Sequence, residues 1–222
     1  MKKIIFTLFL VTTVNSIWAQ KTKVEIETEY GKIVAILYDN TPQNSNNMIK
    51  LAGEHFYDST LWHRVIPQFV IQGGDPESKH ATAGQLLGQG ELKYKVPAEI
   101  NDTDFHKRGA LGVARDNNPE KIGSACQFYI VVGKRYNDAE LDDISRRTHR
   151  TFTPAQREVY KTIGGTPSLD GGYTVFGEVI EGMDVVDKIV NAQRDPRDRP
   201  YKDVHIQTLR VAKKKKKFLG LF

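Results

Sequence analysis

Residues Leu61–Asp75 read LWHRVIPQFVIQGGD, and the rest of the chain is organised around this stretch. Apolar, β-branched and aromatic side chains dominate it, which predicts two strands, Leu61–Val65 and Phe69–Gln72. Pro67 lies between them and marks a turn. The stretch then reaches Gly73-Gly74, where a glycine lets the backbone turn sharply or approach a neighbouring strand closely.

Arg64 is the one cation of this stretch. On paired strands it would lie beside a sheet face, close to Phe69 and Gln72 of the next strand. A cation, an aromatic ring and a neutral amide would then surround one spot. Composition alone leaves two interpretations open, an ordinary hairpin with a surface arginine and an active-site arginine.

Residues Phe56–Pro76, FYDSTLWHRVIPQFVIQGGDP, closely resemble the signature of the cyclophilins, the cyclosporin-binding family of peptidyl-prolyl cis-trans isomerases. This resemblance favours the active-site interpretation of Arg64. It continues in the family's order over most of the chain between Lys23 and Val211. The further blocks are TPQNSNNMIKLA (Thr41–Ala52), YKVPAEI (Tyr94–Ile100), GALGVAR (Gly109–Arg115), CQFYIVVG (Cys126–Gly133) and LDGGYTVFGEVIEGMDVVDKI (Leu169–Ile189).

Short β-type runs predominate outside this stretch. Val24–Thr28 and Lys32–Tyr38 predict an opening hairpin, and Thr41-Pro42 predict the N-cap and first position of a helix that ends near Ala52. This helix is expected to bury Met48, Leu51 and Ala52. A second helix is predicted over Gly182–Asn191, with Val185, Val186, Ile189 and Val190 facing inward. Many short strands with few helices favour a mainly β fold with a closed antiparallel barrel, and the resemblance implies eight strands capped by two helices. Later strands are expected at Ala98–Ile100, Gly109–Val113, Gln127–Val132, Val175–Val179 and Val204–Val211.

Residues 134–168 do not fit the minimal family pattern. Asn137 with Glu140, and Thr153 with Gln156, have the spacing of capping boxes at helix starts. We therefore predict a helical hairpin inserted beside the rim of the active site. A purely decorative insertion and a functional one both stay open.

The start of the chain differs in composition from its middle. Two lysines precede the apolar run Ile4–Val11, and Ala19 is a small residue suited to cleavage. This layout predicts a signal peptide over residues 1–19, because the apolar run is too short for a comfortable membrane span. An uncleaved anchor is the alternative. We expect one domain, residues 20–212, that works in the periplasm or outside the cell.

The formal net charge of +5 comes from the two ends. Lys2, Lys3 and Lys213–Lys217 carry seven positive charges, so the remaining residues carry −2. A slightly acidic body argues against binding of nucleic acid. The tail, residues 213–222, combines five lysines with an apolar tip. It is either a frayed end or a membrane-surface contact, since lysine is attracted to anionic lipid. We expect a monomer.

Cysteine and histidine usage limits the possible chemistry. Cys126 is the only cysteine, which excludes an intramolecular disulfide, and its apolar surroundings predict a small buried side chain. His63 adjoins Arg64 and is expected to be a packed structural residue. The other histidines show no ligand spacing, so we expect no metal site and no cofactor; they are His55, His80, His106, His149 and His205.

The resemblance implies an isomerase that acts on proline-containing polypeptides, with Arg64 as the catalytic residue. A proline-peptide binding module or holdase with little catalysis is the alternative. The implied substrate-binding residues are Phe69, Val70, Tyr129 and Leu169 around the proline, Gln72 as a hydrogen-bond partner of the substrate backbone with Gln127 supporting it, Ala114 and Arg115 along the groove for the preceding residues, and Tyr173 where the family often has histidine.

Three positions depart from the usual family pattern. Tyr129 replaces a phenylalanine and adds a hydroxyl group, and Val70 replaces a methionine and leaves more room. Ser168 falls where many members carry a tryptophan whose N–H contacts cyclosporin. We therefore expect weak inhibition by that drug.

Overall fold

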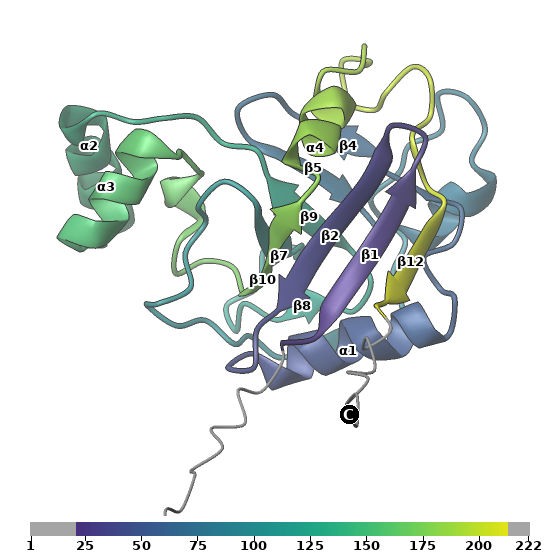
Figure 1. The fold of residues 1–222 in the computed structure, drawn as a ribbon, viewed down its shortest axis with the longest axis horizontal. Coiled ribbons are helices and arrows are strands. Elements are labelled where there is room, and N and C mark those ends of the chain that lie inside the picture. The colour runs from purple at the N-terminus through teal and green to yellow at the C-terminus, as the bar shows by residue number, and fades with distance from the viewer. Residues whose placement is uncertain (1–20, 213–222) are drawn as a thin grey trace, which may run out of the picture.

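One curled antiparallel sheet forms the centre of the molecule (Figure 1). The computed structural model describes residues 21–212. The predicted signal peptide, residues 1–19, and the predicted basic and apolar tail, residues 213–222, lie outside the described residues.

The sheet has eight strands in the order β12-β1-β2-β10-β7-β9-β5-β4. Two small two-stranded sheets accompany it, β3 (Thr60–Leu61) with β11 (His205–Ile206), and β6 (Lys95–Val96) with β8 (Gly123–Ser124). The strands of the main sheet are β1 (Lys23–Thr28), β2 (Gly31–Leu37), β4 (Arg64–Val65), β5 (Val70–Gly73), β7 (Ala110–Val113), β9 (Phe128–Val131), β10 (Val175–Glu181) and β12 (Thr208–Val211).

The prediction of a closed barrel was wrong. β12 and β4 are the two ends of the sheet and do not pair with each other. The predicted strand Leu61–Val65 is split in two, and its first part, β3, pairs with β11 outside the main sheet. Single backbone bonds such as Trp62 N–H to Val204 O (2.8 Å) bridge the gap instead. The result is a half-barrel, since these bonds do not form a continuous ladder.

The predicted strand Ala98–Ile100 is also absent. β6 ends at Val96, and Pro97, which follows, has no N–H to donate to a ladder. Glu99 bonds instead to the first turn of α1 (Pro42–Gly53), where its carboxylate accepts from the N–H groups of Gln43 and Asn44 at 3.0 and 2.9 Å. Thr41 precedes this helix as predicted, but its side chain makes no capping bond.

Two helices lie at opposite ends of the curled sheet, α1 and α4 (Met183–Val190) (Figure 1). The apolar face of α1 is buried as the sequence predicts, through Met48, Leu51 and Ala52. α4 likewise buries its valine and isoleucine side chains. Packing therefore holds both helices in place.

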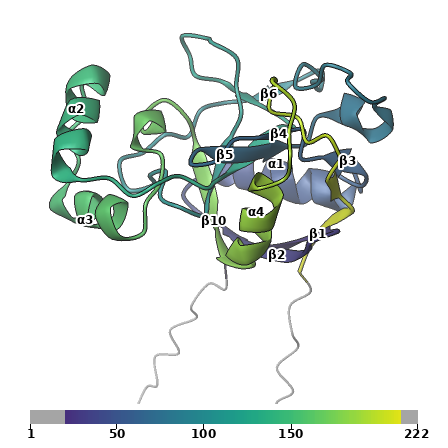
Figure 2. The same cartoon turned by 90° about the horizontal axis from the view of Figure 1, so that it is seen from above.

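The other two helices, α2 (Asp138–Thr148) and α3 (Pro154–Thr162), lie together on one side of the sheet (Figure 2). Both predicted helix starts are confirmed, because each has a complete capping box. Two short 3-10 turns, Pro76–His80 and Pro167–Leu169, complete the helical elements of residues 21–212. The pair of α2 and α3 has a small apolar cluster of its own. The cluster contains Leu141, Ile144, Phe152 and Tyr160.

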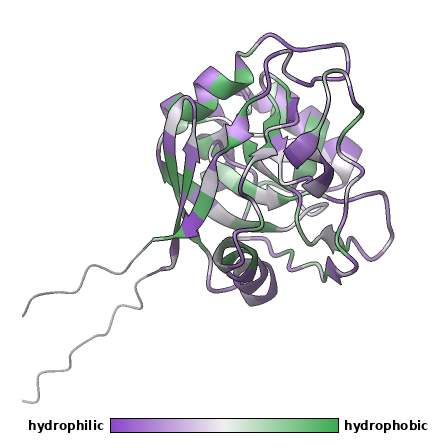
Figure 3. Cartoon of the chain, turned by 90° about the vertical axis from the view of Figure 1, so that its right-hand side faces the viewer, coloured by the Kyte–Doolittle hydropathy of each residue, from purple (hydrophilic) through white to green (hydrophobic). Residues whose placement is uncertain are grey.

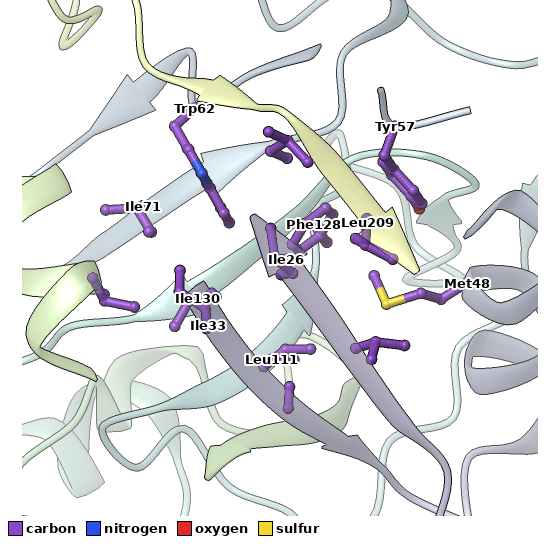
Figure 4. Close-up of a cluster of buried hydrophobic side chains, with 14 of the residues drawn as sticks. Ile26, Ile33, Met48, Tyr57, Trp62, Ile71, Leu111, Phe128, Ile130 and Leu209 are labelled. Carbon is purple, nitrogen blue, oxygen red and sulfur yellow. The ribbon is translucent and has the colours of Figure 1, made fainter. Parts of the chain in front are cut away.

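The strands bury side chains on both of their faces. Ile71, Leu111 and Ile130 point to the main core, together with Trp62 and Phe128 (Figure 4). Their neighbours along each strand point the other way, because successive side chains alternate across a sheet. Apolar colour follows the strands and polar colour follows the outer loops (Figure 3). The face of the sheet that points away from the main core is therefore available for a site.

The glycine pair after β5 behaves as its sequence indicated. Gly74 has a φ of 92°, and a Cβ there would overlap the carbonyl oxygen of Cys126. Cys126 is a buried free cysteine, which confirms that prediction.

Candidate active site

Three polar side chains form a row across neighbouring strands. Arg64 on β4 lies opposite Gln72 on β5, and Gln72 lies opposite Tyr129 on β9. Residues directly opposite each other share one face of a sheet. The register therefore brings a cation, an amide and a phenol together on the face that points away from the main core.

An apolar cluster adjoins this row on the same face. Its buried part includes Val70, Ala114 and Tyr129, and Phe69, Leu169 and Tyr173 are half-buried around it. These six all belong to the predicted substrate-binding set. The remaining members of the apolar cluster are Ala110, Val131, Val175 and Tyr38. A buried floor with a partly exposed rim is the form expected of a small apolar binding site.

Arg64 is only loosely paired within the described residues. Its side chain is 43% exposed, and its Nε lies 3.9 Å from Oδ2 of Asp198. With Gln72 it lines a cavity of about 300 Å³, which residues 85–89 and the loop that carries Arg199 complete. A guanidinium placed in this way is partly accessible from the cavity.

Gln72 is held by Gln127, as the predicted supporting role requires. The Nε2 of Gln72 donates to Oε1 of Gln127 at 3.0 Å, and Nε2 of Gln127 donates to the carbonyl of Gly90 at 2.8 Å. Gln127 is buried. The chain of bonds orients the Gln72 amide, whose oxygen is still an acceptor for a peptide N–H.

Arg115 lies beside Tyr173 at the edge of the apolar cluster. Its guanidinium stacks over the ring of Tyr173 at 4.5 Å, and its Nε donates to the carbonyl of Gly172 at 2.8 Å. The preceding residue, Ala114, is buried in the apolar cluster. Arg115 is therefore fixed along the rim, unlike Arg64.

His63 is packed beneath this surface. It is 4% exposed, and neither ring nitrogen has a hydrogen-bond partner among residues 21–212. Burial lowers the pKa of His63 to about 4. The imidazole is therefore neutral at physiological pH, in agreement with a structural histidine.

The sequence interpretation missed three residues that are linked by hydrogen bonds to the hydroxyl of Tyr129. The Tyr129 hydroxyl lies 2.8 Å from Nε2 of His106, and Nδ1 of His106 lies 2.7 Å from Oδ1 of Asp170. The hydroxyl of Tyr160 donates to Oδ2 of Asp170 at 2.6 Å. The only signals in the sequence were a histidine in a polar loop and a tyrosine on the inner face of an insertion.

Residues 21–212 contain no candidate metal site and no helix that could span a membrane. No group of three or more histidine, cysteine, aspartate or glutamate side chains there could hold a metal ion. None of the helices described is both long and apolar enough to cross a bilayer.

Sequence comparison relates the chain to one family. The family described as "Cyclophilin type peptidyl-prolyl cis-trans isomerase/CLD" matches residues 23–211. A protein of Staphylococcus aureus named as a peptidyl-prolyl cis-trans isomerase is 33% identical over 190 residues, which are 85% of this chain and 91% of that protein.

A second relative is longer. A Streptococcus pyogenes protein, named as a bifunctional phosphatase and peptidyl-prolyl cis-trans isomerase, is 35% identical over 192 residues. The match spans 38% of the length of that protein.

Solved structures show the same fold. A cyclophilin-type peptidyl-prolyl cis-trans isomerase of Cryptosporidium parvum superposes with a TM-score of 0.65 at 24% identity, over 88% of this chain and 100% of that one. The same enzyme in the presence of the dipeptide Ala-Pro gives a TM-score of 0.61.

Proposed function

The chain belongs to the cyclophilin-type family and is a peptidyl-prolyl cis-trans isomerase, and from this premise we propose that Arg64 carries the catalytic step. The single observation that supports this role is the loosely paired, half-exposed guanidinium in register with Gln72 and Tyr129. A donor in that place can reach a peptide bound over the apolar cluster.

The chemistry requires such a donor. Resonance makes rotation about an X–Pro bond cost about 18–20 kcal/mol. As the bond twists, the nitrogen lone pair leaves the π-system and becomes a hydrogen-bond acceptor. A donor aimed at that nitrogen stabilises the transition state more than the planar ground state, which is the condition for catalysis.

Arginine fits this task because it is charged at every working pH and donates through a rigid fork. One charge-assisted hydrogen bond contributes about 1.5–3 kcal/mol, or about one to two powers of ten in rate. Binding of the peptide by the groove supplies the rest. The reaction moves no proton, so the neutral His63 is not needed as a base.

Two sets of residues in the proposed groove bind different parts of the substrate. Phe69, Val70, Tyr129 and Leu169 surround the proline ring, which is apolar. Gln72, supported by Gln127, binds the substrate backbone, and Ala114, Arg115 and Tyr173 line the path of the residues before the proline. Support comes from the shared apolar cluster, from the hydrogen bond of Gln72 to Gln127 and from the contact of Arg115 with Tyr173.

The setting of the activity is also part of the proposal. The composition of residues 1–19 supports export to the periplasm or the medium, where the enzyme would act as a monomer on newly exported proteins. The lysine-rich tail, residues 213–222, would add a weak contact with anionic membranes. Sedimentation with anionic vesicles, with and without the tail, tests this last point, and equal partitioning would contradict it.

The decisive experiment compares Arg64→Ala with the parent protein on a proline tetrapeptide, with turnover and peptide binding measured separately. We expect turnover to fall about 10- to 100-fold while binding changes little. Arg194→Ala is the matched control, because Arg194 also contacts Asp198, at 3.4 Å, from outside the groove.

Unchanged turnover in Arg64→Ala would remove Arg64 from the mechanism. A parent protein that binds proline peptides but barely speeds their isomerisation above the uncatalysed rate would favour the alternative, a binding module or holdase.

A further inference from the structure

We propose that the helical insertion is a positioning element of the active site: Tyr160 on α3, through Asp170 and His106, holds the hydroxyl of Tyr129 and with it the wall of the proline pocket. This inference rests on the proposed function only in assigning Tyr129 to that pocket. Tyr160, Asp170 and His106 touch no substrate and act through Tyr129.

The hydrogen bonds form an unbroken chain from the insertion to the sheet. Tyr160 bonds to one oxygen of Asp170 at 2.6 Å, and the other oxygen accepts from both the ring and the backbone N–H of His106, at 2.7 and 2.8 Å. His106 then bonds to Tyr129 at 2.8 Å. Every distance is short for its type of hydrogen bond.

The carboxylate of Asp170 determines the direction of the bonds, because its two oxygens only accept. Burial raises the pKa of Tyr129 and that of Tyr160 well above the ordinary value, so both hydroxyls keep their protons and can donate. Tyr160 donates to Asp170. With Tyr129 donating to Nε2, His106 carries its proton on Nδ1 and donates it to Asp170. Each donor along the chain therefore meets an acceptor.

All four side chains are buried. A buried polar group that loses its partner keeps the full cost of its removal from water. Tyr129 therefore gains from keeping its hydroxyl against His106, and rotation of its ring would leave Nε2 of His106 unpaired. The chain makes one orientation of Tyr129 preferable to all others.

The hydroxyl end of the Tyr129 ring also lies against the backbone of β7. A Cβ at Gly112 would overlap Cζ, Cε2 and the hydroxyl oxygen of Tyr129. The absence of a side chain at Gly112 thus provides the space for this end of the ring, and the bond to His106 orients its hydroxyl. A supporting contact and a hydrogen bond together define the position of the side chain.

The same chain reaches a second wall of the pocket. Asp170 follows Leu169 directly, so its anchored carboxylate restrains the segment that presents Leu169. Thr166, just before it, donates from its backbone N–H to the carbonyl of His106 at 2.7 Å. The loop from the end of α3 to Leu169 is therefore tied to His106 at two points.

The position of Tyr160 is set by the packing of the insertion. Its ring meets Phe105, Tyr136 and Phe152 edge-on, with centroid distances of 5.4, 6.4 and 5.7 Å. The hydroxyl projects from this aromatic cluster to Asp170. A change in the packing of α2 and α3 would consequently move the Tyr160 hydroxyl, the donor at the start of the chain.

A double-mutant cycle on catalysis tests the proposal. Tyr160→Phe and Tyr129→Phe each remove one hydroxyl and keep the ring. We expect Tyr160→Phe to lower kcat/KM on a proline tetrapeptide about 3- to 10-fold. In the Tyr129→Phe background the same change should have almost no effect, because its route to the pocket has been removed. Tyr136→Phe, in the same aromatic cluster but outside the chain, is the matched control.

Nuclear magnetic resonance provides a readout that does not depend on activity. The Nδ1 proton of His106 should give a signal protected from exchange in the parent and in Tyr136→Phe, and this signal should move in Tyr160→Phe. Equal losses of kcat/KM from Tyr160→Phe in both backgrounds would overturn the proposal, as would an unchanged His106 signal.

The failure of the proposed function looks different. If the parent showed no isomerase activity, or if Arg64→Ala kept it, the role of Arg64 would fall while the His106 spectra still tested the chain of bonds.

Discussion

Arg64 and Tyr129 lie on the same sheet face with only Gln72 between them, yet their polar groups have opposite surroundings. Arg64 is partly exposed, its nearest carboxylate is 3.9 Å away, and it borders a cavity of about 300 Å³. The hydroxyl of Tyr129 is buried and bonded to His106 at 2.8 Å. We refer to the surroundings of Arg64 and Gln72 as the open side, and to Tyr129, His106, Asp170 and Tyr160 as the closed side.

The difference shows how one sheet face serves two needs of the reaction. A donor that must meet a transient acceptor has to be free of strong partners in the protein, which is the condition of Arg64. A wall that shapes a pocket has to stay in one place, and a satisfied buried network provides rigidity of that kind. Preorganised sites commonly combine such free groups with a fixed support.

The largest expected effect is on the closed side. Asp170→Asn replaces a carboxylate that accepts three hydrogen bonds, and its new NH₂ group would face a donor. We expect the free energy of unfolding to fall by about 3–5 kcal/mol, measured by urea denaturation. Asp198→Asn on the open side is the control and should cost less than about 1 kcal/mol, since its ion pairs are exposed. Similar losses in the two variants would remove the distinction between the sides.

Acid should destabilise the protein through His63, which lies under the open side. Its pKa is lowered to about 4 by burial, so between pH 6.5 and 4 the unfolded chain binds the proton more readily. His63 therefore does not lower the free energy of unfolding above pH 6.5. As the pH drops from 6.5 to 4, this free energy falls by up to about 3 kcal/mol. Unfolding of the parent and of His63→Gln at a series of pH values measures this.

Between pH 6.5 and 4 the free energy of unfolding should depend less on pH in His63→Gln than in the parent protein. The isomerase rate should stay flat between pH 6 and 8, because neither arginine nor this imidazole changes charge there. A bell-shaped rate profile would instead indicate an acid–base step.

Loss of Gln127 should release Gln72 on the open side and leave the hydrogen bonds of the closed side intact. Gln127→Ala removes the acceptor that orients Gln72 at 3.0 Å. We expect kcat/KM to fall about tenfold, since a misplaced amide no longer binds the substrate backbone, while the His106 signal stays in place. Gln207→Ala, an exposed glutamine on the opposite edge, should leave kcat/KM unchanged. If Gln127→Ala moved the His106 signal, the two sides would be coupled.

The smallest effect is expected at the rim, at Ser168. This residue is exposed beside Leu169 and borders a surface hollow next to α2. Ser168→Trp would restore the indole N–H that many cyclophilins carry there. We expect cyclosporin to bind about 3- to 10-fold more tightly, the contribution of one neutral hydrogen bond, as measured by inhibition. Nanomolar inhibition of the parent protein would contradict this account of Ser168.

Local patterns predicted those elements whose partners lie nearby in the chain. The opening hairpin, the buried faces of α1 and α4 and the capping boxes at Asn137 and Thr153 all agree with the structure. The closed barrel was wrong because closure depends on whether β4 and β12 meet, which neither strand's own residues decide. The strand at Ala98–Ile100 was wrong because Glu99 found a better partner at the start of α1.

The proposed site divides in the same way. Resemblance to a family selected Arg64, Phe69, Gln72 and Tyr129, and the register of β4, β5 and β9 brings three of them into one row. The hydroxyl of Tyr129 was visible in the sequence as an addition to the pocket. Its partner was not, because His106 had no spacing that related it to Tyr129.

The sequence by itself determined most of the strands and helices, the single cation of the signature and the residue types around it, because these depend on neighbours within a few positions. Only the tertiary structure decided that the half-barrel stays open and that His106, Asp170 and Tyr160 join the insertion to Tyr129. Those bonds connect side chains up to 64 positions apart, and such pairs are set by how the sheet curls and how the insertion packs against it.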